Sequence, residues 1–269
     1  MTAATDVRAL DVPGARLTYE VRGTGPLLLL MGSPMGAAYF ADVADALADG
    51  RTVVTHDPRG IARSTVDDAA QDSTPELRAA DVAALLDALD APVADVLGSS
   101  GGAVTALALA QHHPGRVRTL VAHEPPLLGL LPDAADHHAR TELVVQTFHE
   151  HGVAAAWGAF AGAAGWEDDA EGPPVVDDDE GFARDGARFF AHELRGTTTW
   201  LPDVAALRAG AQRVVVGVGQ ESGALETAAT SAALAALLGV EVTFFPGEHG
   251  GFMEHPAAFA ERLVAVLDA

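Results

Sequence analysis

The sequence predicts an α/β protein with a mostly parallel central sheet, flanked by helices and interrupted by a helical insertion. Three observations support this class. Short apolar runs alternate with helical patterns over residues 15–122, and the same alternation returns over 213–268. The stretch between these two regions has helical patterns but no convincing strand. We therefore expect a core built from residues 1–126 and 201–269, with residues 127–200 inserted as a helical cap.

The predicted strands of the first half are short and mostly apolar. Residues 15–22 alternate between inward and outward side chains, which is typical of a strand with one buried face. Residues 26–31 (PLLLLM) form a continuous apolar run, as expected for a strand buried on both faces. Similar apolar runs predict strands at 52–55, 93–97 and 117–122.

The helices predicted between these strands make a parallel sheet the natural solution. The helix at 75–90 carries Pro75 and Glu76 in its first turn, where proline and an acidic side chain are both favoured. A second helix follows at 101–113, before the last strand of this half. After the insertion, the order strand, helix, strand, helix is predicted at 213–218, 224–238, 241–245 and 257–268.

The composition fits a large core and argues against several kinds of partner. Hydrophobic residues make up 49% of the 269 residues, and the mean hydropathy is +0.17. The formal net charge of −22 repels phosphate groups, so we expect neither nucleic acid nor membrane surfaces as partners. The acidic stretch 167–180 is interpreted as a solvated loop between cap helices.

Absent residue types and segments narrow the chemistry further. The chain has no cysteine and no lysine, which excludes a thiol nucleophile, cysteine zinc sites and a Walker phosphate loop. The first residues lack the pattern of a signal peptide, and no apolar run is long enough for a membrane span. We therefore expect a cytoplasmic protein.

The motif with the clearest chemistry is Gly98-Ser99-Ser100-Gly101-Gly102, which joins the strand at 93–97 to the following helix. This is a G-x-S-x-G sequence in the strand–turn–helix setting that gives the motif its meaning. Small residues on both sides allow a sharp turn that exposes the hydroxyl of Ser100. We predict Ser100 as a nucleophile, with Ser99 as the rival hydroxyl one position away.

A serine nucleophile needs a histidine base, and the base needs an acid to orient it. His249 follows the last predicted strand, where α/β sheets place their sites, and is the predicted base. Two residues are candidates for the acid. Glu124 follows the strand at 117–122 and Glu221 follows the strand at 213–218, so the spacing alone leaves both open.

Four segments, LLLLMGSPMG, HDPRGIARS, GSSGG and GEHGGFMEHP, resemble the α/β-hydrolase superfamily over nearly the whole chain. Residues 85–126 resemble more specifically the fungal lactone hydrolases that open the macrocyclic mycotoxin zearalenone. In that family the acid is the glutamate of a His-Glu-x-Pro segment, so the resemblance favours Glu124 over Glu221. Position 99 departs from the family, because it is serine where the family has cysteine.

The resemblance also implies an oxyanion hole. Its two N–H donors should come from Gly101 and from the loop after the 26–31 strand, where Ser33 is preferred and Gly32 is the alternative. We expect an apolar substrate pocket beneath the cap. The candidate pocket residues are Met35, Leu128, Leu131, Trp157, Phe160 and Trp200.

These residues predict a serine hydrolase that cleaves a carboxylic ester or lactone, such as a macrocyclic resorcylic lactone, through an acyl-enzyme. No cofactor and no metal is implied. The alternatives are other chemistry on the same fold, namely C–C bond hydrolysis or cofactor-free perhydrolysis, and a ligand receptor without activity. The expected partner is a small hydrophobic ester or lactone, and the chain is either a monomer or a homodimer.

Overall fold

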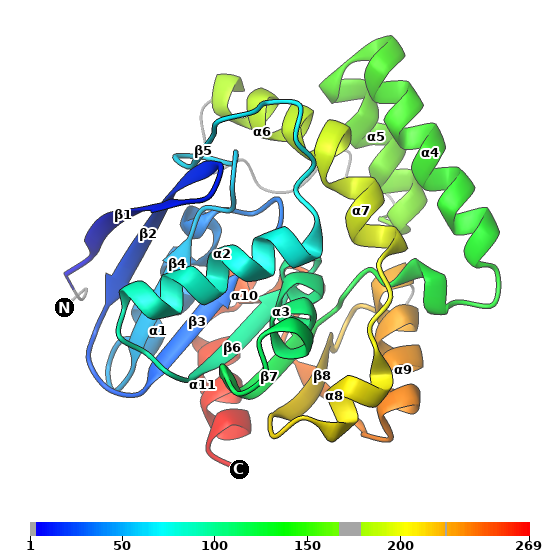
Figure 1. Ribbon diagram of the computed structural model, residues 1–269. Coiled ribbons are helices and arrows are strands. Elements are labelled where there is room, and N and C mark those ends of the chain that lie inside the picture. Colours follow the sequence, from blue (N-terminus) through cyan, green and yellow to red (C-terminus); the bar gives the residue numbers. More distant parts are fainter. Residues whose placement is uncertain (1–3, 167–178, 224) are drawn as a thin grey trace.

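The computed structural model describes residues 4–166, 179–223 and 225–269, and a nine-stranded sheet forms its centre (Figure 1). The order across the sheet is β1-β2-β4-β3-β6-β7-β8-β9, and β5 pairs with β2. The strands are β1 (Asp6–Val12), β2 (Ala15–Arg22), β3 (Leu27–Met31), β4 (Thr52–His56), β5 (Thr65–Val66), β6 (Ala94–Ser99), β7 (Val117–His123), β8 (Arg213–Gly219) and β9 (Val242–Phe245).

Most of the sheet is parallel. The pairs that β2 forms with β1, β4 and β5 are antiparallel, whereas the pairs from β4 through β3, β6, β7 and β8 to β9 are parallel. This arrangement confirms the predicted α/β class with a mostly parallel sheet. The strand order reverses beside β3, and such a switch point is where open α/β sheets bind ligands, at the carboxyl ends of the strands.

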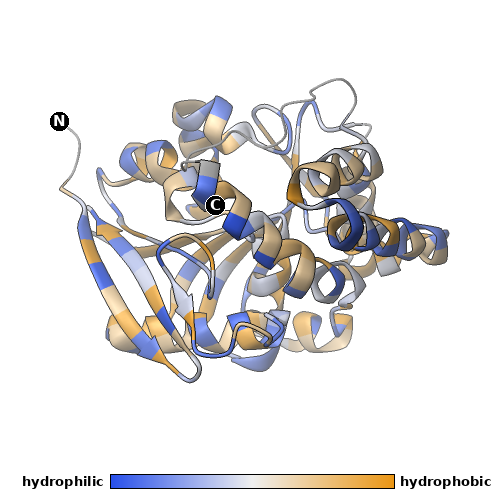
Figure 2. Cartoon of the chain, turned by 90° about the horizontal axis from the view of Figure 1, so that it is seen from above, coloured by the Kyte–Doolittle hydropathy of each residue, from blue (hydrophilic) through white to orange (hydrophobic). Residues whose placement is uncertain are grey.

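Alternate side chains of the central strands face two separate cores. Leu29 and Met31 of β3 pack on one face, while Leu28 and Leu30 pack on the other. The first face is covered by α2 (Pro75–Ala88), α3 (Gly101–His112), α8 (Val204–Ala209) and α9 (Glu226–Leu238). The second is covered by η1 (Ala37–Phe40), α1 (Ala41–Leu47), α10 (Gly251–Glu254) and α11 (Pro256–Leu267). Figure 2 shows hydrophilic and hydrophobic residues side by side on the helices of the molecule.

A group of helices separates β7 from β8. It comprises η2 (Leu128–Leu130), α4 (Ala134–His151), α5 (Val153–Ala164), α6 (Asp179–His192) and α7 (Leu194–Thr199). In Figure 1 these helices gather beyond one end of the sheet, and an apolar cluster of their own holds α4, α5 and α6 together. We refer to α4–α7 as the cap helices. The division into core and cap at residues 127 and 200 stays a prediction, and residues 167–178 of the predicted acidic loop lie outside the described residues.

Some elements were not predicted. β1 lies at the edge of the sheet with most of its side chains in solvent, so its sequence carries no buried apolar face. β5 is a two-residue strand, and α1 and α8 are only seven and six residues long. In the described part of the chain, none of the helices is long and apolar enough to cross a membrane.

Candidate active site

Ser100 alone makes the turn between β6 and α3. The strand ends at Ser99 and the helix begins at Gly101, so the chain reverses within one residue. Ser100 has φ 56° and ψ −128°, a conformation that a residue with a side chain rarely adopts. Its N–H donates a hydrogen bond to the carbonyl of His123 at 2.9 Å, which fixes the turn against β7. This is the local geometry expected of a nucleophile on a strained strand-to-helix turn.

Two glycines make this turn possible because other chain segments pass very close to them. A Cβ atom at Gly98 would lie 2.4 Å from the carbonyl oxygen of Gly102. A Cβ atom at Gly102 would lie 2.3 Å from the carbonyl oxygen of Met31, at the end of β3. Neither position can carry a side chain unless the backbone moves. The glycines of the motif therefore have the packing role that the sequence predicted.

His249 and Glu124 form a short contact across the carboxyl ends of β7 and β9. His249 Nδ1 lies 2.6 Å from Glu124 Oε2. A carboxylate can only accept, so Nδ1 carries a proton in this contact, and the tautomer with a free acceptor at Nε2 is the one that the contact favours. Ser100 and His249 line the same cavity. The structure thus brings the predicted nucleophile, base and acid to one edge of the sheet.

The carboxyl group of Glu124 is completely buried and held by several donors. The N–H of Gly219 donates to Oε1 at 2.8 Å, and the hydroxyl of Thr227 donates to Oε2 at 2.8 Å. Burial by itself raises the pKa of this carboxyl, but the hydrogen bond and charge of His249 outweigh it and hold the pKa well below its usual range. Glu124 is therefore an ionised partner for His249 at neutral pH.

Glu221, the other candidate for the acid, has a different environment. Its backbone N–H donates to the carbonyl of Gly247 at 3.1 Å, so the residue helps to join the loops after β8 and β9. Its side chain is exposed at the rim of the cavity. The geometry supports Glu124 as the acid that orients His249.

The loop after β3 lies directly against the turn at Ser100. A Cβ atom at Gly101 would lie 2.8 Å from the carbonyl oxygen of Ser33 and 3.0 Å from its Cβ atom. Gly101 must therefore be glycine for Ser33 to approach so closely. Gly32 is tight in the same way, since a Cβ atom there would lie 2.7 Å from the Cβ of Met35. The predicted oxyanion residues Ser33 and Gly101 are neighbours, and both line the cavity with Ser100.

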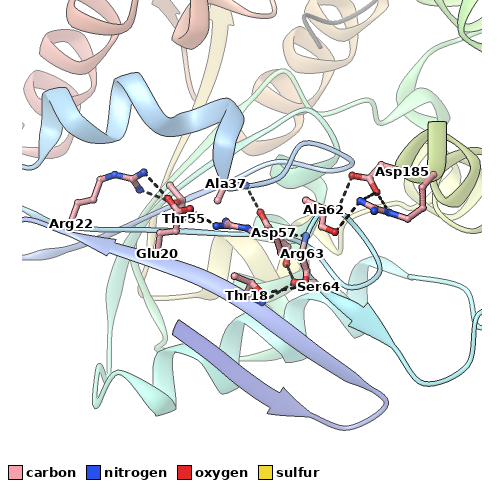
Figure 3. A network of polar contacts seen from close by, with 11 residues as sticks. Thr18, Glu20, Arg22, Ala37, Thr55, Asp57, Ala62, Arg63, Ser64 and Asp185 are labelled. Carbon is pink, nitrogen blue, oxygen red and sulfur yellow. Dashed lines mark hydrogen bonds and ion pairs between the residues drawn. The ribbon is translucent and has the colours of Figure 1, made fainter. Parts of the chain in front are cut away.

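A polar network holds this loop, residues 32–37, from the core side (Figure 3). Asp57 Oδ1 accepts a hydrogen bond from the N–H of Ala37 at 2.8 Å, and Asp57 Oδ2 lies 2.7 Å from Arg63 Nε. The same network reaches the cap helices, because the N–H of Ala62 donates to Asp185 at 2.8 Å. Asp57, which lies in the segment HDPRGIARS, thus anchors the loop after β3, and residues 56–60 are not among those that line the cavity.

The cavity above Ser100 has a volume of about 570 Å³, and aromatic and aliphatic side chains line much of it. Of the predicted pocket residues, Met35, Leu128, Trp157 and Phe160 line it. Further aromatic residues were missed by the prediction, among them Trp166, whose ring centroid lies 5.9 Å from that of His249. Trp166 stands just before the acidic stretch at 167–180, and nothing in that sequence pattern indicates a residue that lies next to His249.

Two of the predicted pocket residues, Leu131 and Trp200, are not among the residues that line this cavity, so these predictions are corrected. The chain after α7 turns back toward the core, and the indole N–H of Trp200 donates to Glu76 of α2 at 2.7 Å. Trp200 packs against the core cluster on the first face of the sheet. Leu131 ends the short helix η2 and is half-buried outside the cavity wall.

Clusters of three or more histidine, aspartate or glutamate side chains that could hold a metal ion do not occur within residues 4–166, 179–223 and 225–269. His112 is the last residue of α3 and His113 follows it directly. His137 and His138 are neighbours within α4. His137 is engaged by Glu226 at 2.6 Å and by Asp133 at 3.1 Å. The expectation that no cofactor is needed stays a prediction.

Known proteins place the chain in a family. The model of the α/β-hydrolase fold matches residues 25–176. An uncharacterized hydrolase of Bacillus subtilis, YraK, is 31% identical over 265 residues, which is 96% of this chain and 95% of the relative. The chain belongs to the α/β-hydrolase family and is a hydrolase.

More particular relatives agree with this membership. The zearalenone hydrolase of Bionectria ochroleuca is 29% identical over 262 residues, with 91% of each chain covered, which confirms the resemblance noted above. Among solved structures, a hydrolase from Pseudomonas aeruginosa PA01 superposes with a TM-score of 0.70 at 27% identity, covering 98% of this chain and 99% of the other. A thermophilic esterase from Thermogutta terrifontis shares the fold, with a TM-score of 0.75 at 20% identity and coverage of 100% and 98%.

Proposed function

We propose that the chain is a serine hydrolase that cleaves a carboxylic ester or lactone. The observation that carries this proposal is the 2.6 Å contact between His249 and the buried Glu124, at a cavity that Ser100 also lines. A neutral histidine that is oriented by a carboxylate, beside a serine on a strained turn, is the arrangement that activates a hydroxyl nucleophile.

In the proposed mechanism, Ser100 Oγ attacks the carbonyl carbon while His249 Nε2 takes the hydroxyl proton. The negative charge that develops on the carbonyl oxygen is stabilised by the N–H groups of Gly101 and Ser33. His249 then returns the proton to the leaving alkoxide, and an acyl-enzyme remains. Water attacks this ester with the same base assistance, which releases the acid. Glu124 stays ionised and stabilises the imidazolium in both steps.

The cavity favours a neutral hydrophobic substrate with an aryl group. Trp157 stacks with Phe182 and Phe189 at centroid distances of 5.6 and 5.7 Å, which places an aromatic stack at the edge of the cavity. The charged groups around the cavity are mostly acidic, namely Asp185, Glu221, Glu226, Glu248 and Glu254 against Arg140. An anionic ester would be repelled by these carboxylates. A macrocyclic resorcylic lactone such as zearalenone is neutral and aromatic and therefore fits this chemistry.

We propose further that the enzyme works in the cytoplasm on small molecules, without a metal or cofactor. The groups named above supply the nucleophile, the base and the oxyanion donors. The net charge of −22 supports small neutral substrates over nucleic acid or anionic membrane surfaces.

The proposal is tested by incubating wild type and Ser100→Ala with zearalenone and a panel of smaller lactones and aryl esters. We expect ring opening by the wild type, seen in mass spectra as a gain of one water, and loss of this product in the variant. Binding of the lactones without any ring opening or ester cleavage across the panel would instead indicate a receptor and contradict the proposal.

A further inference from the structure

Glu193 is a buried carboxyl group that reaches the loop after β3 from the cap side. It stands between α6 and α7 and is 1% exposed. Its Oε2 atom accepts a hydrogen bond from the hydroxyl of Ser33 at 2.7 Å, across a separation of 160 residues in the chain. The guanidinium of Arg78 lies farther away, at 3.8 Å. The direct partner of Glu193 is therefore a residue of the proposed oxyanion hole.

The other contacts of Glu193 leave Ser33 as its principal hydrogen-bonding partner. In the described part of the chain, Oε1 of Glu193 has no hydrogen-bond donor. Burial raises the pKa of this carboxyl, while Arg78 opposes the rise. A buried carboxyl group with so few donors contributes little to the stability of the fold. An apolar residue of similar size would usually fill the position at a lower cost in free energy of folding.

Ser33 is where a small displacement would affect the reaction. Its backbone packs on Gly101, within 2.8 Å of the position that a Cβ atom would take. Its N–H is one of the two proposed donors to the developing oxyanion, and such donors act only when they are held in place before the reaction. The hydroxyl bond to Glu193 fixes the side chain of this same residue.

We propose that Glu193 is a positioning residue, which holds Ser33 from the cap side so that its N–H points at the oxyanion. Asp57 holds the far end of the same loop from the core side, through the N–H of Ala37. The loop is thus tied at both ends, and one of the two ties comes from the cap helices. This inference rests on the proposed function, because it assigns an effect on the hydrolysis that Ser100 begins.

A matched control exists at the same junction of cap and core. Arg188 of α6 donates to the hydroxyl of Ser73 at 2.8 Å, and both side chains are buried. This contact joins cap to core as the contact of Glu193 does. Ser73 is not among the residues that line the cavity, so it tests the junction without touching the loop after β3.

The test compares four variants in an aryl ester assay, with circular dichroism and thermal unfolding to confirm folding. Ser33→Ala removes the hydroxyl and keeps the N–H. We expect kcat to fall about tenfold and KM to change less than about twofold. This loss in kcat is smaller than the loss expected when a whole oxyanion donor is removed. Glu193→Leu should lose a similar factor, whereas Glu193→Gln keeps an acceptor oxygen and should stay within about threefold of wild type. Ser73→Ala should unfold at a lower temperature than wild type, and its kcat should equal that of wild type.

The double variant Ser33→Ala/Glu193→Leu separates positioning from general damage. We expect it to be as slow as either single variant, about tenfold, and not about a hundredfold, because both changes break the same bond. Affinity for an aryl boronic acid, which adds to Ser100 and places an oxygen on the oxyanion donors, should fall by the same factor as kcat.

Several results would overturn the inference. These are wild-type kcat in folded Ser33→Ala or Glu193→Leu, a loss in Glu193→Gln as large as in Glu193→Leu, and a double variant whose losses multiply. If Glu193→Leu does not fold, Ser33→Ala and the boronic acid affinity still decide. Failure of the proposed function is distinct, since wild type would then lack activity or Ser100→Ala would retain it.

Discussion

At the scale of single residues, the backbone of Glu124 is as unusual as that of Ser100. Both residues have positive φ, 50° and 56°, although each carries a side chain. The N–H of Glu124 donates to the carbonyl of Gly217 at 3.0 Å, so the chain bends immediately after β7 and directs the carboxyl toward His249. Strain at two residues of one site is typical of a position that the surrounding structure holds for chemistry.

The first prediction distinguishes the two acids that the sequence left open. Glu124→Gln should lower kcat by about 10³–10⁴-fold, because an amide cannot stabilise the imidazolium and favours the wrong tautomer of His249. Glu221→Gln should stay within about threefold of wild type, since its side chain is exposed at the rim of the cavity while Glu124 holds the imidazole ring. Ester hydrolysis at saturating substrate measures both. A large loss in Glu221→Gln alone would contradict the assignment of Glu124.

The sequence could place the three proposed reacting residues near one another because each lies at the end of a predicted strand. Ser100, Glu124 and His249 follow β6, β7 and β9, and the topology of a parallel sheet brings these ends together. The contacts of Glu193 and Trp166 could not be predicted in this way. They depend on how the cap helices sit over the sheet, and no sequence period encodes the packing of one helix group on another.

At the scale of elements, the turn between β6 and α3 depends on how closely three chain segments approach one another. Met31 at the end of β3, Gly98 in β6 and Gly102 in α3 meet with no room for a side chain at either glycine. This close approach also explains why a sequence motif sufficed to predict the local structure. In contrast, β1 was missed because an exposed edge strand needs no apolar pattern to form.

The second prediction tests this packing with two glycine-to-alanine changes on helices. Gly102→Ala should destabilise the protein by about 1–3 kcal/mol, because the methyl group would overlap the carbonyl of Met31. Gly158→Ala, in α5, meets nothing within 4 Å and should stabilise by about 0.5–1 kcal/mol through helix propensity. Denaturant unfolding measures both free energies. Equal stability of Gly102→Ala and wild type would show that the turn is looser than described.

At the scale of the whole molecule, stability should depend on pH through two histidines that are buried in the uncharged form. Burial lowers the pKa of His56 and of His123 to about 4, although Asp57 and Glu124 respectively oppose the shift. An exposed histidine in the unfolded chain has a pKa of about 6.5. Between these two values the unfolded state binds more protons than the folded state, so acid favours unfolding.

The third prediction follows from this sign. The free energy of unfolding should be highest above about pH 6.5 and should fall by on the order of 1 kcal/mol per pH unit for each histidine as the pH drops toward 4. Urea unfolding at pH 7, 6 and 5 measures the slope. His56→Gln should flatten this slope, because it removes one of the two buried histidines. Stability that does not change from pH 7 to 5 would contradict the buried neutral state of both histidines.

The large negative charge has little part in the account of the fold. Several buried carboxylates are paired with arginine, as in the contact of Asp81 with Arg59 at 2.5 Å. Other acidic side chains, such as that of Glu142, lie on the surface. Around the cavity, the carboxylates of the described residues outnumber the one arginine, Arg140. In the proposed function, the composition therefore bears on the choice of substrate, while the reaction is assigned to Ser100, His249 and Glu124.

The measurement that tests the central claim most directly is active-site labelling with an aryl fluorophosphonate, followed by peptide mass mapping. Attack by the activated hydroxyl displaces fluoride and leaves the phosphonate on the nucleophile. We predict one label per chain, on Ser100. The Ser100→Ala variant should lose both the labelling and the ester hydrolysis. A label on Ser99, or undiminished hydrolysis in Ser100→Ala, would contradict the assignment of Ser100 as the nucleophile.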